Sequence, residues 1–173
     1  MRKIILYIAM SLDGKIADEN GNVNWLVGDD IHDTSSTYDN FIQNIDTVIM
    51  GYNTYHQVVT ELSPDTWVYK GLKTFVFTHK SLTSSYGIEF INESIVDKIQ
   101  QLKQENGKDI WICGGASIIQ PLIENHLIDI YRISIIPTIL GKGISLFSSY
   151  SQNLKLIESK TINGIIELIY EKK

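Results

Sequence analysis

The chain has 173 residues, a formal net charge of −5 and a pI of about 5.3. This acidic balance argues against a nucleic-acid partner, because phosphate backbones attract clustered Lys and Arg. The single cysteine, Cys113, excludes a disulfide framework and a cysteine-based zinc site, and no His/Glu spacing suggests a metal. The length predicts one domain over residues 1–173, with a hydrophobic content of 43% that is usual for a globular protein.

The first apolar run, residues 3–10, predicts a buried strand that is too short to cross a membrane. No small-residue cleavage site follows it, so we expect a cytoplasmic protein without a membrane partner. The polar segment 11–24 predicts a long functional loop, a candidate lid with Gly14 and Gly21 as hinges. Residues 29–43 place apolar side chains at helical spacing and predict a helix.

A strand over 46–50 leads through Gly51 into a helix that Ser63-Pro64 ends, with Asn53 or Thr54 as the expected cap. Strands are also predicted over 74–78 and 88–91. The capping box that begins at Ser94 predicts the next helix, which stops by Gly107.

A second apolar strand, 109–113, runs through Gly114-Gly115 into a helix over 116–126. A strand over 129–137 follows, and Asn163-Gly164 joins two final strands, 154–161 and 164–171, into a hairpin. Strands that alternate with helices predict an α/β fold with a mainly parallel sheet covered on both faces. The C-terminal hairpin adds an antiparallel edge.

Gly51 and Gly114-Gly115 each connect the end of an apolar strand to a helix. A glycine there lets a ligand approach the backbone, and the free N–H groups of the first helical turn favour negative charge. Two such helix starts in one small domain predict that a diphosphate, and hence a dinucleotide coenzyme, is bound between them. Tight strand–helix packing without a ligand is the structural alternative.

Four motifs together resemble the dihydrofolate reductase-like family, and within it the reductase domain of the riboflavin-biosynthesis deaminase–reductase. They are Ser11-Leu12-Asp13-Gly14-Lys15-Ile16-Ala17 with Trp25-Leu26, Val48-Ile49-Met50-Gly51-Tyr52-Asn53-Thr54-Tyr55, Cys113-Gly114-Gly115-Ala116, and Pro137-Thr138-Ile139-Leu140-Gly141-Lys142-Gly143. The resemblance implies a three-layer fold with an eight-stranded, mainly parallel sheet and four helices. It also implies an NADPH-dependent reductase of a small heterocycle, and a homodimer.

Carried over by position, the resemblance assigns the coenzyme to five groups of residues. Ala9 and Ile16 would touch the nicotinamide, and Trp25 would line the nicotinamide or substrate site. The remaining contacts would come from Gly51, Tyr52, Asn53 and Thr54 on the adenosine side, from Thr78, His79 and Lys80 near the adenine and 2′-phosphate, and from Gly114, Gly115, Ala116, Ser117 and Ile118 at the diphosphate.

The sequence departs from the family pattern where an arginine usually follows the first junction glycine, because Tyr52 stands there. Lys80 is the candidate replacement for its charge. Neither Arg2 nor Arg132 is a candidate substrate clamp, because both fall in the apolar strand regions.

Asp30, five residues after Trp25, is the candidate catalytic acid that supplies or relays a proton, and a helix N-terminal acid is the alternative interpretation. Three functions remain open. They are a reductase of the 5-amino-6-(5-phosphoribosylamino)uracil type, a dihydrofolate reductase, and a nucleotide-binding protein without turnover.

Overall fold

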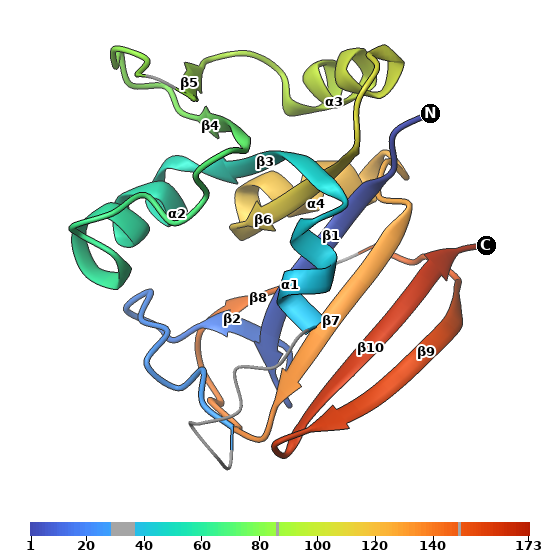
Figure 1. The fold of residues 1–173 in the computed structure, drawn as a ribbon. Coiled ribbons are helices and arrows are strands. Elements are labelled where there is room, and N and C mark those ends of the chain that lie inside the picture. Colours follow the sequence, from blue (N-terminus) through green and yellow to red (C-terminus); the bar gives the residue numbers. More distant parts are fainter. Residues whose placement is uncertain (29–36, 86, 149) are drawn as a thin grey trace.

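In the computed structural model, which describes residues 1–28, 37–85, 87–148 and 150–173, eight strands form one sheet (Figure 1). Their order across the sheet is β5-β4-β3-β6-β1-β7-β10-β9. All neighbours from β5 to β7 are parallel, whereas β10 and β9 run antiparallel to their neighbours. The strands are β1 (Ile4–Ser11), β3 (Ile45–Gly51), β4 (Lys73–Phe77), β5 (Ile88–Ile91), β6 (Asp109–Gly114), β7 (Ile130–Ile136), β9 (Leu154–Ile162) and β10 (Ile165–Lys172). The predicted mainly parallel sheet with a C-terminal hairpin is confirmed.

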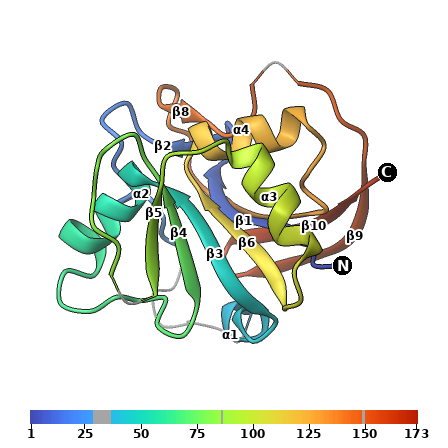
Figure 2. The same ribbon diagram turned by 90° about the horizontal axis from the view of Figure 1, so that it is seen from above.

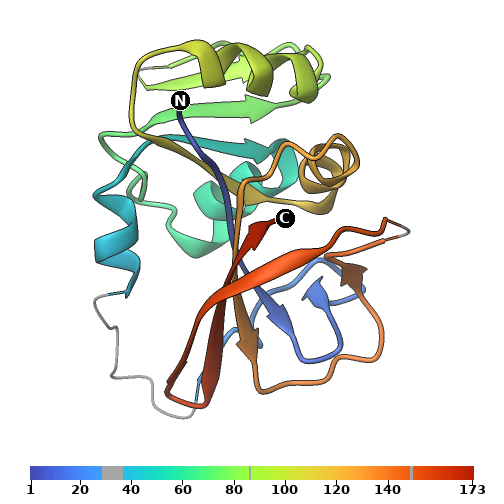
Figure 3. The ribbon, with the colours of Figure 1, turned by 90° about the vertical axis from the view of Figure 1, so that its right-hand side faces the viewer.

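Helices cover both faces of this sheet, which gives the predicted three layers. They are α1 (Thr37–Ile42), α2 (Tyr52–Gln57) with a following π-helical turn η1 (Val58–Leu62), α3 (Ile95–Gln104) and α4 (Ala116–Glu124). Helices α3 and α4 lie together over one face, with Ile99 and Ile119 in its core (Figure 2). Phe41 of α1 and Tyr55 of α2 pack into the core of the other face. Figure 3 shows α1 and α4 on opposite sides of the sheet.

Helix ends follow the local sequence, with two corrections. The helix start predicted at Ser94 is confirmed, because the Ser94 hydroxyl accepts a hydrogen bond from the Asp97 amide at 3.3 Å. The expected cap at Asn53 or Thr54 is wrong, since Gly51 is the N-cap of α2. Helix α4 ends at Glu124 rather than at 126, because His126 takes a positive φ of 53° and the Leu127 amide bonds back to the Leu122 carbonyl.

A second, two-stranded sheet lies inside segments that the sequence pattern assigned to loops. It pairs β2 (Lys15–Ala17) with β8 (Ile144–Ser145). Strands of three and two residues are too short to show an alternating pattern, so the sequence analysis did not predict them. Of the helix predicted over 29–43, the structure describes only the part that forms α1, because residues 29–36 lie outside the described ranges.

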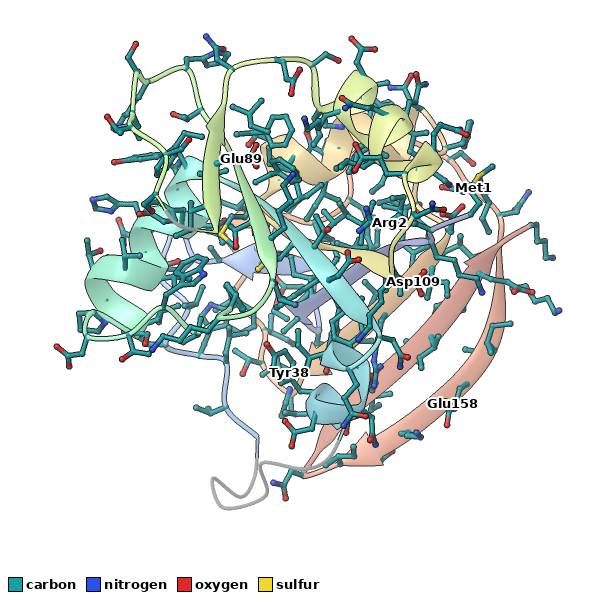
Figure 4. All side chains as sticks on the ribbon, turned by 45° about the horizontal axis from the view of Figure 1, so that its top comes forward. Met1, Arg2, Tyr38, Glu89, Asp109 and Glu158 are labelled. Atoms are coloured by element: carbon teal, nitrogen blue, oxygen red, sulfur yellow. The ribbon has the colours of Figure 1, made fainter. Side chains whose placement is uncertain are left out.

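The two ends of the sheet have different surroundings. Strand β7 has no free edge, because it is hydrogen-bonded to β1 and β10. The outer strands are β5 and β9, on which Glu89 and Glu158 mark opposite ends of the sheet (Figure 4). The chain termini lie together near the start of β1 and the end of β10 (Figure 1). No helix in the described ranges is long and apolar enough to cross a membrane.

Candidate active site

The parallel strands bring the predicted site residues to one edge of the sheet. Strands β3 and β6 are neighbours, and Met50 pairs with Gly114 where both strands end. We call the side where β1, β3, β4, β6 and β7 terminate the carboxyl edge. Ligands of open α/β sheets bind at this edge, because loops and helix starts gather there.

The two glycine junctions lie against each other at the carboxyl edge. A Cβ placed on Gly51 would be 3.2 Å from Ile118 Cγ1 and 3.8 Å from Ser117 Oγ. A Cβ on Gly115 would be 3.6 Å from Thr54 Oγ1. The starts of α2 and α4 are therefore adjacent, as an elongated ligand spanning both would require. Gly115 is also the N-cap of α4, and the Gly114–Gly115 peptide bond is cis.

The first turns of both helices keep their amides free of competing side chains. Glycine at each N-cap provides no side-chain acceptor. Within the described ranges, no side chain accepts a hydrogen bond from the amides of Tyr52, Asn53, Ala116 or Ser117. Since the Ser117 side chain is exposed, this helix start is open to solvent. The junctions thus meet the physical requirement for an anion site.

A cation lies beside the first junction. Lys80 Nζ is 3.9 Å from the centre of the Tyr52 ring, and both residues are at the carboxyl edge. Thr78 accepts a hydrogen bond from the Lys80 amide at 3.1 Å, which shapes the turn after β4. His79 Nδ1 is 2.9 Å from Asn92 Oδ1, so this ring is held by a neighbouring loop. Positive charge is present where the sequence lacks the family's arginine.

The other residues predicted for the site do not all lie on the same face of the sheet. Ala9 shares the α1/α2 face of β1 with Tyr7, because side chains alternate along a strand. Ile16 packs instead against the core of the α3/α4 face. The Trp25 indole donates a hydrogen bond to the Asn22 carbonyl within its own loop. Asp30 lies outside the described residues.

The base of the predicted lid is fixed to a distant segment. The Asp13 carboxylate accepts hydrogen bonds from the Ser11 hydroxyl and from the Leu140 and Gly141 amides. These bonds lower the pKa of Asp13 to about 2, with the Ser11 contact as the largest cause. Lys15 Nζ, the loop's cation, donates to Ser145 Oγ at 2.9 Å.

The far part of that loop reaches helix α2. The Gln57 side-chain amide donates to the Gly21 carbonyl at 3.1 Å. Gly14 and Gly21 both take positive φ angles, of 78° and 84°, as turn residues. The loop therefore lies along the carboxyl edge between β1 and α2.

The α1/α2 face carries a cluster of polar side chains that the sequence analysis did not predict. Arg132 of β7 and Glu167 of β10 form an ion pair, and each side chain is mostly buried. The Arg132 guanidinium lies 4.7 Å from the centre of the Tyr7 ring. Ser134 lies two residues after Arg132 on the same face of β7, and it lowers the pKa of Tyr7. We call Tyr7, Arg132, Ser134 and Glu167 the polar cluster; its signal is polar residues at alternate positions of apolar strands.

Cys113 precedes the second junction on the same face. Its thiol lies 3.7 Å from the Tyr69 hydroxyl. Burial raises the pKa of Cys113 to about 11, and burial likewise raises the pKa of Tyr69. Both groups are thus neutral at physiological pH, and Cys113 behaves as a small apolar residue.

Comparison with known families identifies this arrangement. A family model described as the RibD C-terminal domain matches residues 2–166. The chain belongs to the RibD C-terminal domain family. It is 41% identical over 161 residues to the uncharacterized protein YwjB of Bacillus subtilis (strain 168), covering 90% of this chain and 88% of YwjB. It is 34% identical over 181 residues to YyaP of the same organism, covering 98% of this chain and 94% of YyaP.

Solved structures agree with the RibD-type fold. A putative riboflavin biosynthesis protein from Shewanella sp. PV-4 superposes with a TM-score of 0.85 and 28% identity, covering 99% of each chain. A diaminohydroxyphosphoribosylaminopyrimidine deaminase/5-amino-6-(5-phosphoribosylamino)uracil reductase from Thermotoga maritima gives a TM-score of 0.70 at 16% identity. That match covers 99% of this chain and 57% of the Thermotoga chain. The protein therefore has the dihydrofolate reductase-like fold of a RibD-type, reductase-like domain.

Proposed function

We propose that the protein is an NADPH-dependent oxidoreductase that reduces a small nitrogen heterocycle, of the 5-amino-6-(5-phosphoribosylamino)uracil reductase type. The observation that carries this proposal is the contact between the starts of α2 and α4, where Gly51 meets Ser117 and Gly115 meets Thr54. Membership of a reductase-like family supports it. Bound coenzyme would supply a hydride, so the protein needs no nucleophile of its own.

The residues present fit such a coenzyme. The uncapped amides at Tyr52, Asn53, Ala116 and Ser117 are donors for a diphosphate, and a side chain at Gly115 would project toward Thr54 into the same space. Lys80 would pair with a 2′-phosphate while Tyr52 faces the adenine. Ala9, on the α1/α2 face, would adjoin the nicotinamide, which leaves the polar cluster beside the reacting end.

Coenzyme binding is tested by titrating the protein with NADPH and following tryptophan emission. We expect quenching that saturates, and its absence at millimolar NADPH would contradict the proposal. Ser117→Asp sharpens the test. A carboxylate at this helix start stabilises α4 by about 0.3–1 kcal/mol, yet it repels a diphosphate, so NADPH affinity should fall at least about 10-fold.

Ser94→Asp is the matched control, because it puts the same charge at the start of α3, where no ligand is expected. It should leave NADPH affinity unchanged. Turnover is then measured as NADPH oxidation with 5-amino-6-(5-phosphoribosylamino)uracil and, separately, with dihydrofolate. Oxidation with dihydrofolate alone would assign a folate reductase, and binding without any oxidation would leave a nucleotide-binding protein.

We also propose that the protein is a homodimer that associates through β9. Among the described residues no strand pairs with its outer edge, and Leu156 and Ile157 on it are 51% and 52% exposed. A nine-residue edge strand that carries exposed apolar side chains favours pairing with another strand. Light scattering should give a dimer for the native chain and a monomer for Leu156→Lys, whereas a monomeric native chain would contradict the proposal.

A further inference from the structure

Reduction of a C=N or C=O bond needs a proton as well as a hydride, and this inference rests on the proposed function. The donor must lie near Ala9, where the nicotinamide is expected. On the α1/α2 face, Ala9 pairs with Ser134 of β7, and Ser134 pairs with Glu167 of β10. Two residues earlier on the same face, Tyr7 pairs with Arg132. The polar cluster thus occupies the part of the sheet beside Ala9.

The position of the Tyr7 ring is fixed by two contacts. Phe41 packs edge-on to it, with ring centres 4.7 Å apart. The Arg132 guanidinium, held by Glu167, lies over it at 4.7 Å. Ser134, the residue next to Ala9 across the strands, follows Arg132 by two positions and lies on the same face as Tyr7.

Electrostatics keep this hydroxyl protonated yet able to release its proton. Burial is the main cause that raises the pKa of Tyr7 above 10.0, and Glu167 raises it further. Arg132 and Ser134 lower the pKa of Tyr7, because they stabilise the phenolate. From α1, Tyr38 also faces Tyr7 and is neutral, since burial raises its pKa. Tyr7 is thus a neutral acid with a cation beside its conjugate base.

A purely structural role explains this cluster poorly. Burying an ion pair costs desolvation energy, and apolar residues of similar size often stabilise a fold as well or better. The pair nevertheless occupies a face that is otherwise lined by apolar and aromatic side chains. Perturbed groups that converge at a candidate site are typical of catalysis.

We propose that Tyr7 is the proton donor for the reduction, with Arg132 and Glu167 as positioning residues. Bound coenzyme would supply the hydride that forms the new C–H bond at the substrate carbon. The π pair of the C=N or C=O bond moves to the heteroatom, which takes the proton from the Tyr7 oxygen. The resulting phenolate is stabilised by Arg132 and regains a proton from water. The products are the reduced heterocycle and NADP⁺.

Tyr7→Phe tests this inference, because it removes only the hydroxyl group. Single-turnover NADPH oxidation should slow by about 100-fold or more, while NADPH affinity and the melting temperature stay close to native values. Tyr131→Phe is the matched control. It removes a tyrosine hydroxyl from the opposite face of β7, where that group bonds Gln152 at 2.7 Å. It should leave the oxidation rate unchanged.

Two further measurements separate catalysis from folding. The native rate should be constant across neutral pH, because the Tyr7 pKa lies above 10.0; a rate that falls with a carboxyl-like pKa would overturn the inference in favour of an acid such as Asp30. In difference-absorbance titrations of native protein against Tyr7→Phe, the phenol should ionise above its ordinary pKa. Ser134→Ala should raise that pKa and slow oxidation several-fold.

The outcomes distinguish this inference from the function on which it rests. If Tyr7→Phe oxidises NADPH as fast as Tyr131→Phe, Tyr7 is not the donor and the reductase function stands. If the native protein binds NADPH but reduces neither probe substrate, both proposals fail. Slow turnover by Tyr7→Phe with intact NADPH binding supports both.

Discussion

Arg132 and Glu167 form an ion pair that joins β7 to β10 on the α1/α2 face of the sheet. Arg132 also donates to the Thr37 carbonyl at 3.4 Å, so the pair connects the C-terminal hairpin to the start of α1. Removal of one partner leaves a buried charge without compensation. Arg132→Met should therefore reduce the free energy of unfolding by about 3–5 kcal/mol.

Replacing both partners should recover most of that loss. In Arg132→Met/Glu167→Leu no unpaired charge remains, and denaturant unfolding would show the double variant to be more stable than Arg132→Met alone. If the double variant is as unstable as the sum of the two single variants, Arg132 and Glu167 do not act as a pair.

Lys80 should decide how strongly the protein prefers NADPH over NADH. Its ammonium group lies over Tyr52 at the carboxyl edge, where the 2′-phosphate is expected. Lys80→Gln should weaken NADPH binding roughly 10-fold and leave NADH binding nearly unchanged, because only NADPH carries the extra phosphate. Lys73→Gln is the control. Lys73 lies 4.7 Å from the Phe75 ring at the opposite end of β4, so its loss should affect neither coenzyme. Equal losses for NADPH and NADH would count against this role of Lys80.

Acid should loosen the attachment of the 11–17 segment. The folded-state pKa of Asp13, about 2, is below its ordinary value of 3.8. A group with a depressed folded pKa stabilises the fold above its unfolded pKa, and this contribution is lost as the pH falls from about 4 toward 2. Melting temperatures measured across that range should fall less steeply for Asp13→Asn than for the native protein. Parallel curves would show that the carboxylate does not hold the loop.

Gly143 should be irreplaceable in the small β2–β8 sheet. It has a φ of 142°, and a Cβ there would be 2.2 Å from the Ala17 carbonyl oxygen. Gly143→Ala should cost about 2 kcal/mol or more, because strain and a backbone clash combine. Gly141→Ala provides the comparison, since Gly141 also has a positive φ but nothing within 4 Å, so about 1 kcal/mol is expected. Equal losses in urea unfolding would refute the clash.

The main sheet was predictable because its strands are long and apolar and are separated by residues that favour turns. Residues 3–10 and 109–113 are almost wholly apolar, and Asn163-Gly164 marks its hairpin, so the eight strands could be assigned before their order was known. The order itself depends on non-local pairing, such as Ile4 with Ile110, for which local patterns carry no information.

Some features of the candidate site could likewise be predicted from local sequence, whereas others depend on contacts between distant segments. The glycine junctions predict where the helices start. The proximity of Gly51 to Ser117 could not be predicted, because it depends on how the chain folds. Arg132 was set aside because it lies in a strand, yet alternation directs it to the face opposite Tyr131 and toward Tyr7. The buried position of Arg132 could not be predicted without its partner, because Glu167 comes from another strand.

Both chain termini lie at the amino edge, opposite the strand ends that carry the candidate site. The Ile4 amide bonds the Asp129 carboxylate, and the Lys173 amide bonds the Asn153 carbonyl, so each terminus is anchored there. An affinity tag, a surface linker or a fused catalytic module attached at either terminus would extend away from the helix starts. The architecture is therefore suited to modular combination, in which a second protein unit can be added without obstructing access to the ligand.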